Sequence, residues 1–152
     1  MSESFPPVIE RRVIGLDVGE KRIGVALSDA HGLLATPLTT VSAIPRLSAI
    51  ERIGRLIREN GVSELVIGLP LTLRGEIGPQ AEVVRAFASE LSAAVGLSAN
   101  FFDERLTTAT AEQMLRDLGV RPDKRRQQID QVAASIILQD YLDHTRNRPD
   151  LA

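Results

Sequence analysis

The sequence predicts an α/β fold in which helices flank a mixed five-stranded sheet, with the elements in the order βββαβαβαα. Stretches in which apolar residues alternate predict strands, and stretches in which they recur three or four residues apart predict helices. The 152 residues, 43% of them hydrophobic, suffice for one compact core without disulfides. We therefore expect a single domain over residues 1–152, with an ordered core from about residue 12 to residue 143.

Three strands joined by short turns open the predicted domain. In the first strand, alternation places Val13, Gly15 and Asp17 on one face and apolar side chains on the other. The three strands cover, in chain order, residues 12–18, 23–28 and about 33–40. Charged residues and glycine in the turns between them predict that consecutive strands run antiparallel.

Helices alternate with strands in the rest of the chain. Glycine after a run of helical spacing predicts the end of a helix, and proline is favoured at a helix start. The elements are, in order, a helix carrying Leu47, Ile50, Ile53 and Ile57 that ends at Asn60-Gly61, a strand at 64–69, a helix from Pro79 to Gly96, a strand at 97–103, a helix at 108–118 before Gly119, and a helix at about 127–143. Strands that alternate with helices indicate parallel pairing, so the sheet is expected to be mixed.

The composition excludes several classes of chemistry. The chain has no cysteine, so disulfides, cysteine-bound zinc and thiol catalysis are ruled out. No apolar stretch is long enough to span a membrane, and we expect a cytoplasmic location without membrane contact. His31 lies in a predicted turn and His144 near the end of the chain, which is more typical of solvated than of catalytic histidines.

The charge balance limits how the chain could bind nucleic acid. A net charge of −2 gives no general attraction for a polyanion, so binding requires a local basic patch. One candidate is the segment of residues 121–126, in which four positive charges accompany one negative charge. Taken alone, such a segment is more typical of a solvated loop.

Carboxylates at the ends of two predicted strands are the first indication of chemistry. Asp17 ends the first strand and Gly19 follows, which leaves room for a phosphate or a metal near the backbone. Asp-Val-Gly is also a common turn, so Asp17 alone does not distinguish the two interpretations. At the end of the fifth strand, alternation lets only one of Asp103 and Glu104 point toward a given site.

The last predicted helix carries a carboxylate on its apolar side. Asp130 falls within an arc that also holds Ala133, Ile137 and Tyr141. A carboxylate there needs a salt bridge, a proton or a metal, because burying an unpaired ion is costly. Asp140 projects into the same arc, so helical geometry does not single out Asp130.

Convergence of these acids would define a metal site. If Asp17, Glu104 and Asp130 meet, they form an all-oxygen site that suits Mg²⁺ or Mn²⁺ and does not suit structural zinc. Such an ion can activate a water and neutralise a phosphate. The arrangement therefore favours metal-dependent hydrolysis of phosphodiester bonds, without a nucleophilic side chain.

Four ordered blocks of sequence resemble one known family. The blocks are VIGLDVGEKRIGVALSD at 13–29, VIGLP at 66–70 with Gly75 and GPQA at 78–81, DERLTT at 103–108, and DQVAA at 130–134 with ILQ at 137–139. Together they extend over about residues 12–143, and their order makes the match more specific than any one motif. The chain resembles the YqgF/RuvX family of pre-16S ribosomal RNA nucleases and Holliday-junction-resolvase-like proteins.

This resemblance implies a ribonuclease-H-like fold and a nuclease that matures the 5′ end of precursor 16S rRNA. It assigns Asp17, Glu104 and Asp130 as the catalytic, metal-binding acids, in agreement with the residue-based analysis. It also implies contacts to substrate phosphates from six basic residues, which are Lys21, Arg22, Arg105, Lys124, Arg125 and Arg126. Nucleic acid is then the main partner, either precursor rRNA or branched DNA, with ribosomal or processing proteins as further partners.

Two segments depart from the family's pattern. Residues 71–75 replace an expected asparagine-rich turn, so a contact from a side-chain amide in that turn is in question. Pro122 and Asp123 interrupt the basic segment, which can change the shape of the predicted loop. Asp103 and Asp29 are the nearest candidates for a fourth carboxylate, and strand alternation favours neither.

Three other functions stay open at this point. The Asp17-Val18-Gly19 turn also resembles the phosphate loop of sugar kinases and actin-like ATPases, but those proteins close two such domains around a nucleotide. A non-catalytic RNA-binding module would keep the fold and lose the reaction, although all three acids are present. Holliday junction resolution needs two sites related by a two-fold axis, hence a homodimer, whereas a monomer can trim RNA.

Overall fold

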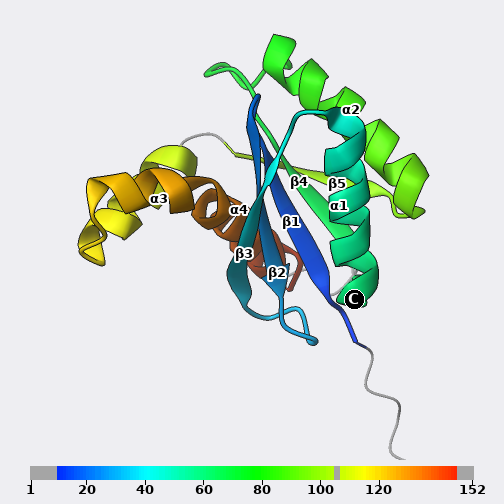
Figure 1. Cartoon of the computed structure of the whole chain (residues 1–152), viewed down its shortest axis with the longest axis horizontal. Coiled ribbons are helices and arrows are strands. Elements are labelled where there is room, and N and C mark those ends of the chain that lie inside the picture. Colours follow the sequence, from blue (N-terminus) through cyan, green and yellow to red (C-terminus); the bar gives the residue numbers. More distant parts are fainter. Residues whose placement is uncertain (1–9, 105–106, 147–152) are drawn as a thin grey trace, which may run out of the picture.

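The computed structural model describes residues 10–104 and 107–146 of the chain (Figure 1). Its elements are, in chain order, β1 (Val13–Val18), β2 (Arg22–Ser28), β3 (Ala35–Ser42), α1 (Arg46–Glu59), β4 (Glu64–Leu69), α2 (Pro79–Val95), β5 (Ala99–Asp103), α3 (Thr107–Asp117) and α4 (Pro122–Arg146). The predicted order of elements is confirmed.

The strands form one mixed sheet in the order β3-β2-β1-β4-β5. The central strand β1 pairs antiparallel with β2 and parallel with β4. The outer pairs are antiparallel between β2 and β3 and parallel between β4 and β5, where α2 makes the crossover connection. The predicted meander and the predicted mixed sheet are therefore both present.

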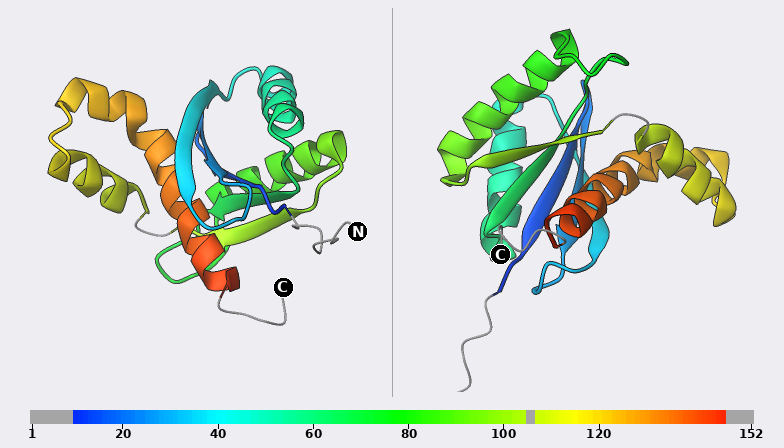
Figure 2. Two further views of the ribbon diagram at one scale, coloured as in Figure 1. Left: turned by 90° about the horizontal axis from the view of Figure 1, so that it is seen from below. Right: turned by 180° about the vertical axis from the view of Figure 1, so that it is seen from behind.

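Helices cover both faces of this sheet. α1 and α2 pack on one face, α4 crosses the other, and α3 packs against α4 away from the sheet (Figures 1 and 2). Ile14 and Leu16 of β1 belong to the core beneath α1 and α2, whereas Val13 packs with Leu138 and Leu142 of α4. Both leucines are fully buried, and burying one such side chain contributes about 1.5–3 kcal/mol. These contacts hold α4 on the sheet.

Two glycines on the α4 face of the sheet permit a close approach of side chains and helix. A Cβ atom at Gly24 in β2 would overlap the carbonyl oxygen of Asp130 in α4. A Cβ atom at Gly68 in β4 would lie 2.5 Å from Oε2 of Glu104 and 2.6 Å from Cδ1 of Ile137. Because the Gly24 contact is with backbone, no side chain fits there, and the missing side chain at Gly68 leaves the space that the Glu104 carboxyl occupies.

The predicted start of the last helix is wrong. α4 begins at Pro122 and not near residue 127, so the basic segment lies in the first turns of a helix and not in a loop before it. Proline suits the first position of a helix, and the carboxylate of Asp123 suits its positive end. The two residues that interrupt the basic run are thus the ones that start the helix.

The predicted bounds of the third strand are also shifted. β3 covers Ala35–Ser42 instead of about 33–40. The side chain of Asp29 accepts hydrogen bonds from the backbone N–H groups of Leu33 and Leu34, at 2.7 and 3.0 Å, and holds these residues in the preceding turn. Within the described parts of the chain, no helix combines the length and apolarity that a membrane span needs.

Candidate active site

The carboxyls of Asp17 and Glu104 meet at one end of the sheet. Asp17 lies near the end of β1, where it pairs with Gly24 of β2. Glu104 directly follows β5, and its backbone N–H donates to the carbonyl of Leu69 at 3.3 Å. The Glu104 side chain passes over Gly68 and forms a hydrogen bond with Asp17. Two strands that are not adjacent in the sheet therefore supply one pair of acids.

Burial makes it costly for both of these acids to be charged. Desolvation and the hydrogen bond to Asp17 raise the pKa of Glu104 to about 9, and the charges of Asp17 and Asp103 add to this effect. Desolvation also raises the pKa of Asp17, although the hydrogen bond from Glu104 opposes the shift and the charge of Asp130 reinforces it. At neutral pH the Glu104 carboxyl thus keeps its proton and donates it to the Asp17 carboxylate.

Asp130 approaches the same place from α4. Its carbonyl oxygen lies against Gly24, next to Asp17 in the sheet, and its charge acts on the pKa of Asp17. Its carboxylate Oδ2 accepts a hydrogen bond from Nε of Arg22 at 2.7 Å. The Asp130 side chain is 21% exposed and that of Arg22 57%, so this ion pair sits at the edge of the site. Asp140, by contrast, is exposed and lies close to Asp143.

The chemistry of these donors fits a divalent cation. Three carboxylates without a thiol or an imidazole suit Mg²⁺ or Mn²⁺. The close pair of Asp17 and Glu104 can carry two charges only if a positive charge compensates them. Among the described residues no three acidic or histidine side chains form a ready-made metal cluster, and Asp130 pairs with Arg22 instead. A cation at this site would have to replace a proton on one acid and a guanidinium on another.

Neither candidate for a fourth carboxylate lies in the group formed by the three acids. Asp29 follows β2 at the opposite end of the sheet, where its hydrogen bonds to two backbone N–H groups lower its pKa. Asp103 is exposed, and its charge contributes to the raised pKa of Glu104. Alternation along β5 therefore sends Glu104 toward Asp17 and Asp103 to the surface, as expected for consecutive residues.

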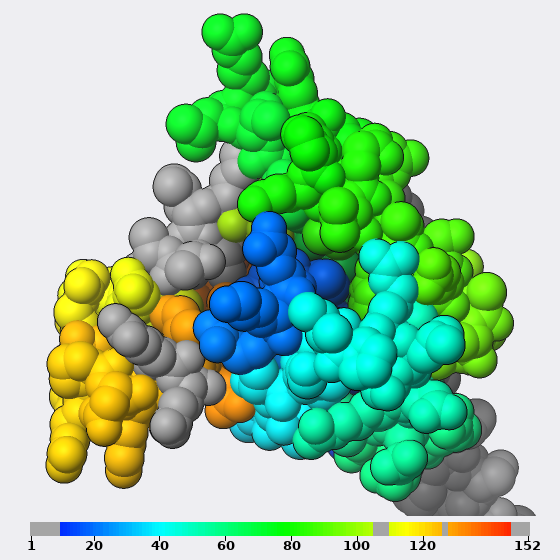
Figure 3. Space-filling view, turned by 45° about the horizontal axis from the view of Figure 1, so that its top comes forward, coloured from blue at the N-terminus to red at the C-terminus, as the bar shows by residue number. Residues whose placement is uncertain are grey.

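Basic residues predicted to bind phosphate lie in two places beside the acids. Lys21 lies in the turn between β1 and β2, Arg22 is the first residue of β2, and both are exposed. Figure 3 shows this turn in blue between the α3–α4 pair, in yellow and orange, and the green segment that contains α2. Lys21 and Arg22 line a shallow pocket together with Asp130. Only Arg22 of these two basic residues forms a salt bridge with one of the three acids.

The basic segment lies at the start of α4. Lys124 is exposed, whereas the guanidinium of Arg125 donates to the carbonyl of Val120 at 2.8 Å and so joins α4 to the connection that follows α3. Arg105 and the side chain of Arg126 lie outside the described residues. Lys124 and Asp130 are six residues apart on one helix, which is about 9 Å along its axis.

Comparison with known proteins shows which family this chain belongs to. Residues 11–144 match the family described as RuvX, Holliday junction resolvase. The chain belongs to the RuvX family. A relative from Chloroflexus aurantiacus, provisionally named a pre-16S rRNA nuclease, is 61% identical over 138 residues, which cover 91% of this chain and 90% of that protein. A relative of the same name from Moorella thermoacetica is 53% identical over 132 residues, covering 87% and 94%.

The names of the RuvX family and of these relatives denote nucleases, which are hydrolases of phosphodiester bonds, as the sequence predicted. Two solved structures share the fold. Thermus thermophilus RuvC in complex with a Holliday junction superimposes with a TM-score of 0.55 at 14% identity, over 91% of this chain and 97% of that one. The fowlpox virus Holliday junction resolvase gives 0.53 at 12% identity, over 88% and 99%. The predicted ribonuclease-H-like fold is therefore confirmed.

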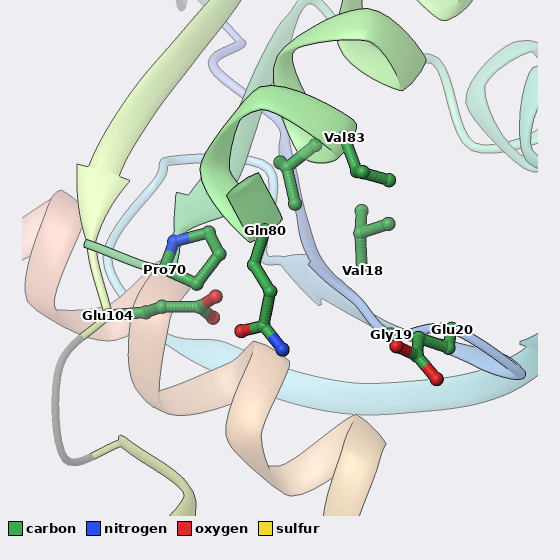
Figure 4. Close-up of a pocket in the computed structure, with 8 residues that line it drawn as sticks. Val18, Gly19, Glu20, Pro70, Gln80, Val83 and Glu104 are labelled. Carbon is green, nitrogen blue, oxygen red and sulfur yellow. The ribbon is translucent and has the colours of Figure 1, made fainter. Parts of the chain in front are cut away.

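The structure also shows a feature that sequence reasoning missed. A cavity beside Glu104 is lined by Val18, Gly19, Glu20, Pro70, Gln80, Val83, Val84 and Glu104 (Figure 4). Gln80 stands in the first turn of α2, within one of the four blocks that resemble the RuvX family. Its membership of that block was the only signal available, because nothing in the local spacing shows that α2 begins next to Glu104.

Proposed function

We propose that this chain is a Mg²⁺- or Mn²⁺-dependent nuclease that cuts precursor 16S rRNA during maturation of its 5′ end. The observation that carries the proposal is the meeting of Asp17 and Glu104 in one hydrogen-bonded pair, with Asp130 beside them. Acids whose pKa is raised by burial, as for Asp17 and Glu104, are typical of functional sites. The names of the relatives support precursor rRNA as the substrate.

The three acids and the nearby basic residues would have different roles. Asp17, Glu104 and Asp130 would hold the cation, which supplies an activated water and neutralises the phosphate. Glu104 would hold the cation as a carboxylate without the proton it shares with Asp17, and Asp130 would hold it in place of the Arg22 guanidinium. The freed guanidinium of Arg22, with the exposed Lys21 and Lys124, would then bind phosphates of the substrate backbone.

Holliday junction resolution is the second candidate, favoured by the family's description and by the fold shared with two resolvases. Resolution requires two copies of the site related by a two-fold axis, whereas RNA trimming does not. We place precursor rRNA first because the relatives with high identity carry that name. Such a substrate implies a cytoplasmic location and contact with ribosomal or processing proteins.

The test is cleavage of a precursor-rRNA fragment and of a synthetic four-way junction, each with Mg²⁺, Mn²⁺ or EDTA. Wild type is compared with Asp17→Asn, Glu104→Gln and Asp130→Asn, each of which removes a ligand with little change in volume. Asp29→Asn, at the opposite end of the sheet, is the matched control. We expect metal-dependent cutting that only the three acid variants lose, by about a hundredfold or more. Full activity in any of the three would overturn the three-acid site.

A further inference from the structure

The cavity beside Glu104 has the size of a single planar ring system. It encloses about 180 Å³ between the β1–β2 turn, the end of β4 and the first turns of α2. For comparison, an apolar cavity of about 150 Å³ in another protein binds benzene. The space is therefore too small for a peptide segment or a helix and large enough for one base.

Most of the cavity wall is apolar. Val18 follows Asp17 at the end of β1, Pro70 follows β4, and Val83 projects from α2. In Figure 4, Pro70 and Glu104 lie on one side of Gln80, and Val18 lies on the other. Val83 is 56% exposed, so its side chain is accessible to a ligand that enters the cavity.

One amide offers the cavity both a hydrogen-bond donor and an acceptor. The side chain of Gln80 extends between Glu104 and the turn at Gly19-Glu20 (Figure 4). Among the hydrogen bonds of the described residues, none involves this amide, and Gln80 is exposed. A glutamine amide can pair with the edge of a base through its N–H and its C=O at once.

The cavity is continuous with the acid site. Glu104 belongs to both, so a phosphodiester bound at the acids would have a neighbouring nucleoside at the cavity. The other charged wall residue, Glu20, is also acidic. Two acidic residues disfavour a phosphate in the cavity itself, whereas a neutral base on apolar walls meets no such repulsion.

We propose that this cavity receives one unpaired nucleobase next to the bond that is cut, with its faces on Val18, Pro70 and Val83 and its edge on Gln80. The inference rests on the proposed nuclease function. A base can enter only after it leaves its stack, so the enzyme selects single-stranded or distorted positions over regular duplex. Gln80 and Val83 are then the specificity-determining residues.

The test begins with an RNA oligonucleotide in which wild type and Mn²⁺ cut at one mapped position. Each nucleotide flanking that position is replaced in turn by an abasic one. We expect one abasic replacement to lower kcat/KM about tenfold, as stacking contributes 1–3 kcal/mol per base in other proteins. Gln80→Ala and Val83→Trp should lower kcat/KM on the intact RNA by a similar factor and have little effect on the abasic RNA.

Matched controls distinguish an effect on the cavity from a general effect of the substitution on a helix. Ala94→Trp introduces the same side chain three turns further along α2, at an exposed position, and Gln113→Ala removes an exposed amide from α3. Neither control should change kcat/KM. Equal cleavage of intact and abasic RNA by wild type, with no effect of Gln80→Ala or Val83→Trp, would overturn the inference and leave the proposed function intact.

A binding measurement tests whether a base enters the cavity, and it does not depend on cleavage. Asp17→Asn protein is mixed with RNA that carries 2-aminopurine at the position identified above, or at each position of a short RNA if wild type cuts nothing. Removal of the fluorescent base from its stack should raise the emission at one position, and Val83→Trp should abolish that rise. No change at any position would overturn the inference, whatever happens in the cleavage assay, and a rise without cleavage by wild type would support the cavity while contradicting the nuclease.

Discussion

Nε of Arg22 lies 2.7 Å from Oδ2 of Asp130, so the first residue of β2 and the middle of α4 are joined by an ion pair. The sequence predicted a metal ligand in one of these residues and a phosphate contact in the other. In this ion pair the two groups neutralise each other. The positive guanidinium of Arg22 thus pairs with the carboxylate that is expected to bind a cation.

Removal of this guanidinium should raise metal affinity. In Arg22→Ala the Asp130 carboxylate has no competing cation, and an ion pair this exposed is worth about 0.2–1 kcal/mol. We therefore expect Mn²⁺ to bind up to about fivefold more tightly, as measured by calorimetric titration at constant ionic strength. Arg46→Ala, which breaks a comparable pair with Glu90 between α1 and α2, on the face of the sheet opposite to α4, is the control. Unchanged Mn²⁺ affinity in Arg22→Ala would show that this guanidinium does not compete with the cation for Asp130.

The raised pKa of Glu104 predicts how stability depends on pH. Because this pKa is about 9 in the folded protein and ordinarily 4.5, the folded state keeps a proton that the unfolded state releases. Between these values, stability in EDTA falls as pH rises. Glu104→Gln cannot ionise, so its Tm should exceed that of wild type by more at about pH 8 than at about pH 5.

Metal should reverse this difference. At a Mn²⁺ concentration of about 100 times its Kd, binding stabilises the folded state by about 2.7 kcal/mol. Thermal unfolding at about pH 8 should therefore show a rise in Tm on adding Mn²⁺ that is large for wild type and small for Glu104→Gln. A Tm difference in EDTA that does not vary with pH would mean that Glu104 has an ordinary pKa.

The close approach of α4 at Gly24 predicts a severe effect from one added methyl group. Gly24→Ala places a Cβ atom where the carbonyl oxygen of Asp130 lies, so α4 must move and carry the acid with it. Overpacking of this kind costs about 1–3 kcal/mol, and activity should fall at least tenfold even where the protein stays folded. Unfolding in urea and cleavage rate are the measurements.

Gly54→Ala is the matched control for that substitution. A Cβ atom at Gly54 in α1 would meet Arg58 Nη1 at 3.3 Å and Val95 Cγ1 at 3.5 Å, and the first contact can be relieved by a flexible side chain. Alanine is also favoured over glycine within a helix by roughly 0.5–1 kcal/mol. Gly54→Ala should thus keep activity and stability. Equal losses from both substitutions would argue against a special role for the Gly24 contact.

Substitutions at Lys124 and Arg125 should differ in their effects on RNA binding and on stability. Lys124 is exposed, so Lys124→Ala should weaken RNA binding, lower the slope of log affinity against log salt by about one, and leave Tm unchanged. Arg125→Ala loses the hydrogen bond to Val120 and should lower Tm as well. Fluorescence anisotropy over a range of salt concentrations tests the first effect and thermal unfolding the second. If affinity and salt slope do not change in Lys124→Ala, the start of α4 is not a phosphate-binding surface.

Local patterns were enough to predict most of the fold. The alternation along β1 correctly separated the face of Val13 and Asp17 from the face of Ile14 and Leu16, because successive side chains of a strand point to opposite faces of the sheet. The start of α4 was missed because Pro122 and Asp123 were interpreted as an interruption of a loop. The same two residues are favourable at a helix start.

The three acids of the candidate site were likewise predicted from the sequence, in blocks that resemble one family. Their arrangement is a tertiary property. Helical spacing could not choose between Asp130 and Asp140, and only the packing of α4 against Gly24 brings Asp130 near Asp17. The ion pair joins Arg22 to Asp130, which are 108 positions apart. The hydrogen bond of Glu104 with Asp17 and the cavity that Glu104 shares with Gln80 also join residues far apart in the sequence. Distances between such residues are set by how whole elements pack, and no local periodicity records them.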